Sequence, residues 1–317
     1  MELSVVICTF NGASKLPKLL DSLSAQKEAS DLPWEIVVID NNSTDNTASV
    51  VASCKENWRK DIPLKYFFEQ RQGLAFARRC AIAKTEASLI GFLDDDTCPN
   101  EDWVCEILKF AEKHPQAGAF GSEISPVFEV SPPDGFNRIA PLFAIIKRGK
   151  KPFIYAKRPG VLPAGAGMVI RKDAWLAHVP EIPVFTGVSG TSLSNKGEDV
   201  ETLSYIRDGG WEVWHNPAMK ISHYIPAVRL ERNYMVRLCH SVGTNRFPLR
   251  MSRYKAWQRA FILPAYILND LRKLIIYTSK NADLIDADIV STCEFVLLRD
   301  TCLSPIYHLI RFLRSDD

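Results

Sequence analysis

The first third of the chain alternates between short, continuous apolar runs and segments whose apolar residues recur every three or four positions. Continuous apolar runs are typical of strands buried on both faces of a sheet, and the wider spacing is typical of amphipathic helices. The pattern predicts strands at residues 4–9, 34–39, 64–68 and 89–93, and helices at residues 16–23, 47–54, 74–83 and 103–111. Because strands that alternate with helices are joined by right-handed crossovers, the sequence predicts an α/β fold with a mostly parallel central sheet flanked by helices.

The regular alternation ends near residue 123. Seven prolines fall between residues 124 and 163, which predicts an irregular, Pro-rich insertion over an edge of the sheet. Beyond it, a polar loop is predicted at residues 183–197 and a helix at residues 198–207. Short β-rich runs predict further strands at residues 168–170, 211–214 and 218–222.

Residues 224–317 are predicted to form a basic, mainly helical C-terminal extension. Its first part, residues 224–264, contains eight arginines and lysines but one acidic residue, a net charge of +7. Residues 261–277 are rich in large apolar side chains interrupted by polar ones, which predicts an amphipathic helix. Two interpretations stay open. The extension could rest on an anionic membrane surface and present a lipid-linked or polysaccharide acceptor, or its arginines could cover the sheet while its apolar residues pack against it.

Composition narrows the class of protein. Hydrophobic residues make up 46% and charged residues 24%, as in ordinary globular chains, and the net charge of +2 gives no field that favours nucleic acid as a partner. Glu2 stands where a signal peptide carries a base, so no signal peptide is expected, and no apolar run reaches membrane-spanning length. The eight cysteines include no Cys-x-x-Cys pair, which is typical of reduced thiols. We therefore expect a cytoplasmic protein, with the inner face of the membrane as a site of peripheral binding.

Acidic and polar residues follow three of the predicted strands, at the edge where ligands bind in parallel α/β sheets. Asp94, Asp95 and Asp96 come directly after a buried strand. Three adjacent carboxylates repel one another, and a divalent cation with oxygen ligands would relieve that repulsion. A solvated acidic turn is the alternative, and the buried strand before the cluster favours the cation. His223 could be a third metal ligand or a phosphate donor, although a single histidine is more often structural.

Other candidate residues each have a structural alternative. Asp40 could accept hydrogen bonds from a nucleobase or a ribose, or close an Asx-turn. Glu198 and Asp199 could supply a catalytic base, or simply suit the dipole at the start of a helix. Arg71 and Arg78, on either side of a glycine turn, could contact phosphate or be solvated bases.

Together these motifs resemble glycosyltransferase family 2, a family of inverting enzymes with the GT-A fold. The resemblance rests on six segments in the family's order: SVVICTFN (residues 4–11), WEIVVIDNNSTD (34–45), GLAFAR (73–78), FLDDD (92–96), GAG (165–167) and GED (197–199). It implies a GT-A domain at residues 1–223, in which residues 1–123 form the nucleotide-binding half. Residues 124–223, with the Pro-rich insertion, would form the acceptor-binding half, and residues 224–317 would be the extension.

The resemblance also implies a role for each candidate residue. In the DxD motif, Asp94 and Asp96 would hold a Mg²⁺ or Mn²⁺ on the donor diphosphate, with His223 as a further metal ligand. Asp199 would be the general base, with Glu198 shaping the acceptor site beside it. The candidate nucleotide-sugar contacts are Thr9, Phe10, Asn11, Asp40, Arg71, Arg78, Asp94 and Asp95. Two positions depart from the family. Position 41 is Asn where many members have Asp, and position 79 is Arg where many have Asn, so the prediction of which nucleobase the donor carries is weaker.

The expected reaction is a single displacement that inverts the anomeric carbon. Asp199 would accept the proton of the acceptor hydroxyl, and the cation would neutralise the leaving diphosphate. A UDP-sugar is the favoured donor, and a glycan or lipid-linked hydroxyl is the expected acceptor. A nucleotidyltransferase would carry more glycine after the first strand, a glycosidase would not need a nucleotide pocket, and a non-catalytic nucleotide-sugar-binding protein would not need both Asp96 and Asp199.

Overall fold

The computed structural model describes residues 1–29, 32–59, 61–155, 162–189, 196–252 and 254–314. The chain forms two compact units. The sheet unit comprises residues 1–127, 144–191 and 198–224, and the helical unit comprises residues 128–143, 192–197 and 225–317. Residues 156–161 of the predicted insertion and residues 190–195 of the predicted polar loop lie outside the described part of the chain.

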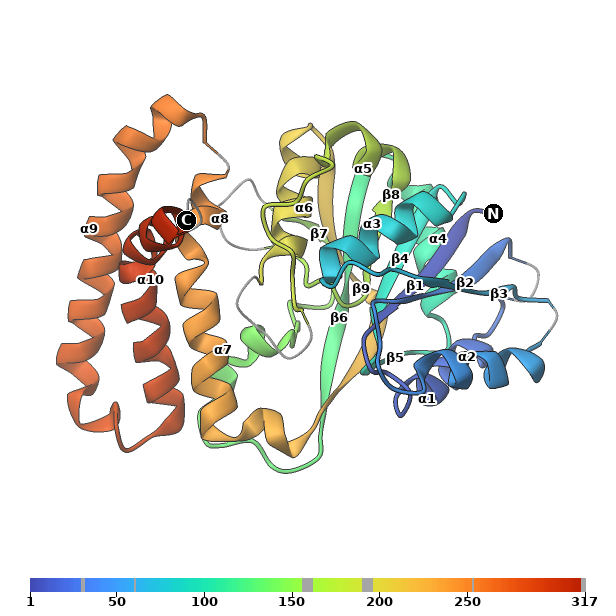
Figure 1. The fold of residues 1–317 in the computed structure, drawn as a ribbon, viewed down its shortest axis with the longest axis horizontal. Helices are drawn as coiled ribbons and strands as arrows, with labels where there is room; N and C mark the ends of the chain where they lie inside the picture. The colour runs from blue at the N-terminus through green and yellow to red at the C-terminus, as the bar shows by residue number, and fades with distance from the viewer. Residues whose placement is uncertain (30–31, 60, 156–161, 190–195, 253, 315–317) are drawn as a thin grey trace. The chain divides into compact units, whose positions relative to one another are not determined.

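Parallel strands form the first part of the sheet (Figure 1). They are β1 (Leu3–Thr9), β2 (Trp34–Asp40), β3 (Leu64–Phe68) and β4 (Leu89–Asp94), and all their mutual pairings are parallel. The intervening helices are α1 (Leu16–Ser24), α2 (Thr47–Glu56), α3 (Leu74–Lys84) and α4 (Trp103–Lys113). This part of the chain confirms the predicted alternation, because each apolar run became a strand and each spaced segment became a helix.

The second part of the sheet is antiparallel. Its strands are β5 (Thr97–Pro99), β6 (Ala117–Phe128), β7 (Phe153–Ile154), β8 (Met168–Arg171) and β9 (Glu212–Ile225), and its helices are α5 (Lys172–His178) and α6 (Glu198–Asp208). The strand order is β3-β2-β1-β4-β8-β6-β9-β5, with β7 also paired to β9. The prediction of parallel strands therefore holds for β1 to β4, while the pairs β4–β8, β6–β8, β5–β9 and β7–β9 are antiparallel.

Two expectations about the second half were wrong. The strands predicted at residues 211–214 and 218–222 are one strand, β9, which runs through Pro217. Pro217 lacks an N–H, and it lies between the residues of β9 that pair with β7 and those that pair with β5, so its missing donor does not break those ladders. The predicted insertion is not irregular from its start, because β6 continues to Phe128 through Pro126.

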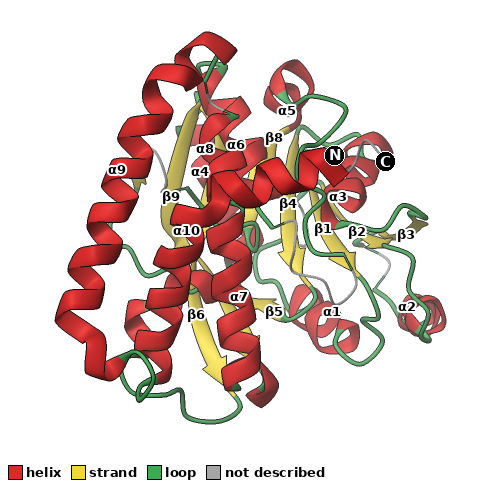
Figure 2. Cartoon of the chain, turned by 60° about the vertical axis from the view of Figure 1, so that its left-hand side comes forward, coloured by secondary structure: helices red, strands yellow, loops and turns green. Residues whose placement is uncertain are grey.

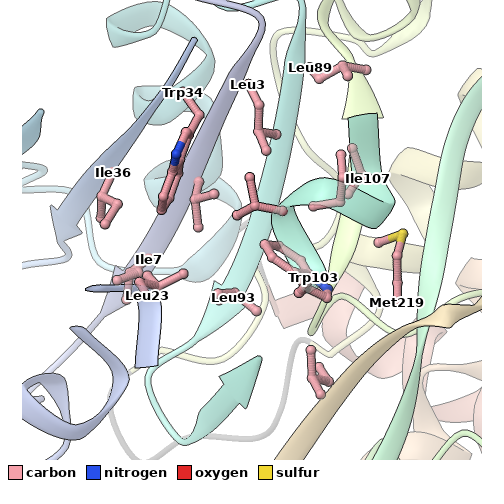
Figure 3. Close-up of a cluster of buried hydrophobic side chains, with 14 of the residues drawn as sticks. Leu3, Ile7, Leu23, Trp34, Ile36, Leu89, Leu93, Trp103, Ile107 and Met219 are labelled. Atoms are coloured by element: carbon pink, nitrogen blue, oxygen red, sulfur yellow. The ribbon is translucent and has the colours of Figure 1, made fainter. Parts of the chain in front are cut away.

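Hydrophobic side chains cover both faces of the sheet, which lies between two helical layers. On one face, Leu3 and Ile7 pack with α1 and α4 in a cluster that includes Trp34 and Trp103 (Figure 3). On the other face, Val6 packs with residues of α3, α5 and α6. Because successive side chains of a strand point to opposite faces, one apolar run supplies both cores. The rigid sheet fixes the positions of the polar residues at its strand ends.

The helical unit is built around α10 (Ile289–Arg314). This helix packs against α7 (Arg232–Thr244), α8 (Arg246–Met251) and α9 (Ala256–Asn281), and Figure 2 shows α7, α10 and α9 side by side. Short 3₁₀ turns lie at Phe136–Arg138, Ala140–Phe143, Ala227–Leu230 and Ala282–Leu284. The amphipathic helix predicted at residues 261–277 is part of α9, so the extension is mainly helical, as expected.

None of the helices in the described part of the chain combines the length and apolar character needed to cross a lipid bilayer.

Candidate functional site

The carboxyl ends of β1, β2 and β4, which are neighbours in the sheet, meet at one edge, as the sequence predicts. Thr9 at the end of β1 is the register partner of Asp40 at the end of β2, and Cys8 is the partner of Asp94 on β4. The peptide N–H of Asn41 donates to the carbonyl of Thr9 at 2.8 Å. The polar residues of three predicted motifs are therefore neighbours in space.

Asp95 ties the loop after β1 to the end of β4. The Thr9 hydroxyl donates to Oδ2 of Asp95 at 2.7 Å, and Nζ of Lys15 lies 2.9 Å from Oδ1. Burial raises the pKa of Asp95, and the positive charge of Lys15 opposes that shift. Lys15 was not among the predicted site residues, although a base in the loop after the first strand is a signal that could have suggested it. Asp95 therefore has a positioning role in addition to any contact with a ligand.

Asp96 and His223 form the part of the site best suited to a cation. Thr97 of β5 is the register partner of His223 in β9, so the short antiparallel pair places Nε2 of His223 3.6 Å from Oδ1 of Asp96. Asp94, at the end of β4, is half-buried. Burial raises the pKa of Asp94, and the charge of Asp96 raises it further, while Arg78 opposes both. Repulsion between two carboxylates is what a bound divalent cation would relieve.

The donor set fits Mg²⁺ or Mn²⁺ in part. Carboxylate oxygen suits both cations, and imidazole suits Mn²⁺ better than Mg²⁺. Among the described residues, no three His, Cys, Asp or Glu side chains converge as a ready-made metal site. Asp96 and His223 are therefore the candidate pair of ligands, and Asp94, which was also predicted to bind the cation, does not form a preformed group of three with them.

Arg78 of α3 is a buried base that pairs with one of the candidate acidic residues. Its side chain is 3% exposed, its Nη1 lies 3.3 Å from Oε1 of Glu198, and its guanidinium stacks 5.5 Å from the ring centroid of Phe92. Burial alone lowers the pKa of Arg78, but the charges of Glu198, Asp199 and Asp94 outweigh burial and raise it. One guanidinium thus pairs with Glu198 at the start of α6 and lies within electrostatic reach of Asp199 and of Asp94 at the end of β4.

Asp199 is held in place by backbone groups. Its Oδ2 accepts a hydrogen bond from the N–H of Gly165 at 3.0 Å, and its Oδ1 accepts one from Val200 at 2.8 Å. Glu198 and Asp199 open α6, so the helix dipole also favours their negative charge. The GAG segment and the GED segment of the sequence are therefore in direct contact.

Gly165 is expected to be intolerant of a side chain. An alanine Cβ at this position would lie 2.2 Å from Nη2 of Arg78, so the guanidinium would have to leave Glu198. We expect Gly165→Ala to lower the free energy of unfolding by about 2 kcal/mol, measured by urea denaturation. In an Arg78→Met background the same substitution should cost much less. Equal costs in the two backgrounds would show that the clash with Arg78 is not the cause.

The remaining predicted contacts lie around the ends of β1 and β2. Asp40 is 2% exposed, and it accepts hydrogen bonds from the N–H of Ser43 at 2.9 Å and from the Tyr66 hydroxyl at 2.7 Å. Burial and the adjacent Asp40 raise the pKa of Tyr66. Asp40 thus bonds to the backbone N–H three residues on, not two residues on as in the Asx-turn considered for it. Its role in binding a nucleobase stays a prediction.

Phe10, Asn11 and Arg71 are more accessible. Phe10 is half-buried, and Asn11 is exposed, with positive φ and a side-chain oxygen that accepts the N–H of Thr44 at 2.8 Å. Arg71 lies on the loop after β3, where it pairs with Glu69 at 3.0 Å and stacks over the ring of Phe76. These residues surround the same strand ends, although Arg71 has an acidic partner of its own.

Asn41 has a role that sequence reasoning missed. Its side-chain nitrogen donates to the carbonyl of Arg71 at 2.7 Å and to that of Glu69 at 3.3 Å, and its oxygen accepts the N–H of Gly73 at 2.7 Å. An aspartate could accept the last of these bonds but could not donate the other two. The departure from Asp noted at this position therefore has a structural reason: the amide holds the loop that leads into α3.

Comparison with known proteins identifies relatives of the chain. The family model "Glycosyl transferase family 2" matches residues 4–168, just over half of the chain. The validoxylamine A glucosyltransferase of Streptomyces hygroscopicus subsp. jinggangensis is 36% identical over 108 residues, which cover 33% of this chain and 24% of that protein. The poly(ribitol-phosphate) beta-N-acetylglucosaminyltransferase TarS of Staphylococcus aureus is 29% identical over 119 residues, which cover 36% of this chain and 19% of TarS. The chain thus aligns with about a quarter or less of the length of these two relatives.

Solved structures show the same fold. The mannosyltransferase PcManGT of Pyrobaculum calidifontis, in complex with GDP-Man and Mn²⁺, superposes with a TM-score of 0.61 at 17% identity and covers 97% of this chain and 87% of PcManGT. S. aureus TarS 1-349 in complex with UDP-GlcNAc superposes with a TM-score of 0.51 at 16% identity and covers 76% of this chain and 66% of that one. The GT-A fold predicted from the sequence is confirmed.

Proposed function

Because the chain belongs to glycosyl transferase family 2, we propose that it is an inverting glycosyltransferase. It moves a sugar from a nucleoside-diphosphate donor, with a UDP-sugar as the favoured class, to a hydroxyl of a glycan or a lipid-linked acceptor in the synthesis of a polysaccharide or cell-envelope glycan. The donor class is supported by the nucleotide sugars bound in two proteins of the same fold, UDP-GlcNAc in TarS and GDP-Man in PcManGT.

One observation carries the proposal: the buried Arg78 forms an ion pair with Glu198 at the start of α6, and it is close enough to Asp199 and to Asp94 at the end of β4 for their charges to raise its pKa. A transferase needs a group that neutralises the departing diphosphate and a base that accepts the proton of the acceptor hydroxyl. Both must lie within reach of one anomeric carbon. Asp94 and Asp96 belong to the first group, and Asp199 is the candidate for the second. Their common neighbour Arg78 brings them into one site of the sheet unit.

Asp199 performs the acid–base step in this mechanism. The carboxylate, oriented by the N–H groups of Gly165 and Val200, accepts the proton of the acceptor hydroxyl as its oxygen attacks the anomeric carbon. The bond to the diphosphate oxygen breaks in the same displacement, so an α-linked donor gives a β-linked product. Glu198 stays paired with Arg78, and this ion pair holds the start of α6 against α3 beside the acceptor.

The donor would lie along the strand ends. Thr9, Phe10, Asn11 and Asp40 surround the position for the nucleoside, and Arg71 borders it on the loop after β3. Asp96 and His223 would bind a Mg²⁺ or Mn²⁺ together with oxygens of the diphosphate, and this cation would supply charge neutralisation for the leaving group. Use of a divalent metal is supported by the Mn²⁺ in the PcManGT complex.

A thermal-shift panel of nucleotide sugars, with and without Mn²⁺, tests the proposal. We expect at least one UDP-sugar to raise Tm by about 3 °C or more at saturation, and only when Mn²⁺ is present. That donor should then be hydrolysed slowly to UDP and free sugar in the absence of an acceptor. Release of pyrophosphate from a mixture of UTP and a sugar 1-phosphate would indicate a nucleotidyltransferase instead, and binding of nucleotide sugars without any hydrolysis or transfer would indicate a non-catalytic protein.

A further inference from the structure

Helix α9 exposes large apolar side chains along one side. Trp257, Phe261, Leu268, Leu271 and Ile275 recur every three, four or seven residues, which places them on the same face of the helix. With Ile276 they form what we call the α9 surface, and each of its side chains is between 41% and 77% exposed. Single exposed apolar residues are common in globular proteins, but a continuous row of this kind marks an interaction site.

The opposite side of α9 is already used for packing within the helical unit. Leu263 and Ile267 line a small cavity shared with residues of α8 and α10, and the buried Asp270 forms an ion pair with Arg250. These contacts fix which side of the helix faces its neighbours. The α9 surface is therefore the side of the helix that does not pack against α8 and α10. No segment in the described part of the helical unit covers it.

Charge identifies the occupant of this surface. Asp270 is the single acidic residue of α9 and is buried in its pair with Arg250, whereas Arg259, Arg272, Lys273 and Lys280 are exposed. Within the residues that the structure describes, none of these four bases has an acidic partner. A second copy of the chain would bring the same positive charges together, which costs free energy. An anionic lipid surface offers negative charge and an apolar layer at once.

We propose that α9 is a docking surface for an anionic lipid bilayer. The helix lies in the plane of the interface, with Phe261, Leu268 and Ile275 among the acyl chains and its bases at the headgroups. Trp257, at the first turn, suits the boundary between the two layers because its ring is apolar and its N–H can donate a hydrogen bond. The inference does not depend on the proposed transfer reaction, since it concerns binding in the absence of any donor.

Co-sedimentation of the full chain with liposomes tests this inference. We expect binding to vesicles that contain phosphatidylglycerol, weaker binding at high salt, and little binding to vesicles of phosphatidylcholine alone. Phe261→Ser/Leu268→Ser should weaken binding at least about tenfold, because two buried apolar side chains are lost. Arg272→Gln/Lys273→Gln should weaken binding to the anionic vesicles and remove much of the salt dependence.

Leu176→Ser/Ile182→Ser is the matched control, because both residues are as exposed as those of the α9 surface but lie in the sheet unit. It should bind vesicles like the unchanged protein, and all variants should unfold at the same urea concentration. Equal loss of binding in the control would overturn the assignment to α9, as would absence of binding at every salt concentration. A concentration-dependent dimer that Phe261→Ser/Leu268→Ser dissociates, without vesicle binding, would assign the surface to a second copy instead.

Discussion

Replacing Asp199 by asparagine is expected to lower kcat by about 10²- to 10⁴-fold, the usual contribution of a positioned general base. Asparagine keeps the size of the side chain and can still accept the N–H of Gly165, so α6 and the GAG segment should stay in contact. The amide cannot take up the proton of the acceptor hydroxyl. The loss should therefore be in kcat, while the concentration of donor needed for half-maximal thermal stabilisation stays near that of the unchanged protein.

Asp208→Asn is the control for this substitution, because Asp208 ends the same helix and its side chain is half exposed. It should leave kcat unchanged and affect stability little. If Asp199→Asn retained more than about a tenth of the original kcat, a base other than Asp199 would be required. If it bound donor poorly instead, Asp199 would be a structural residue of the donor pocket.

Replacing Asp96 by asparagine is expected to abolish the effect of Mn²⁺ on donor binding and to lower kcat/KM by roughly 10²- to 10³-fold. Asp96 and His223 are the proposed pair of ligands, which the β5–β9 pairing brings together, and the amide is a weaker ligand than the carboxylate. The measurement is a titration with Mn²⁺ of the donor-induced rise in Tm, followed by initial rates at saturating Mn²⁺.

The same substitution has a consequence that does not depend on activity. Burial raises the pKa of Asp94, and the charge of Asp96 raises it further. Removing that charge relieves the repulsion, so metal-free Asp96→Asn should be at least as stable toward heat as the metal-free unchanged protein. Asp102→Asn, an exposed carboxylate at the start of α4, should change neither property. A normal response to Mn²⁺ in Asp96→Asn would contradict the assignment of the cation to this pair.

The part of the site that could be predicted consists of residues at the ends of buried strands. Thr9, Asp40 and Asp94 each follow an apolar run, and parallel strands that are neighbours in the sheet end at the same edge. Those two facts need no knowledge of distant contacts. The same local reasoning failed at Pro217, where two strands were predicted and one continuous strand formed; its pairings with β7 and with β5 lie on either side of the proline.

The contacts that join the two halves of the site could not be predicted from local pattern. Arg78 and Glu198 are far apart in the sequence, and either could have been a solvated surface residue. They form a buried ion pair because α3 and α6 cover the same face of the sheet, which depends on where the antiparallel strands insert. The amide of Asn41 likewise found its partners only because the loop after β3 returns over the end of β2.

The sequence by itself determined the alternation of strands and helices, the parallel half of the sheet and the acidic strand ends, since these follow from local periodicity. It also predicted that α9 is amphipathic, but periodicity does not tell which apolar residues of a helix are covered. The tertiary structure decided that one side of α9 packs against α10 and the other faces solvent, and it brought His223 beside Asp96 through the register of β5 with β9. Such contacts depend on the pairing of distant segments, which a local pattern of hydrophobic residues does not specify.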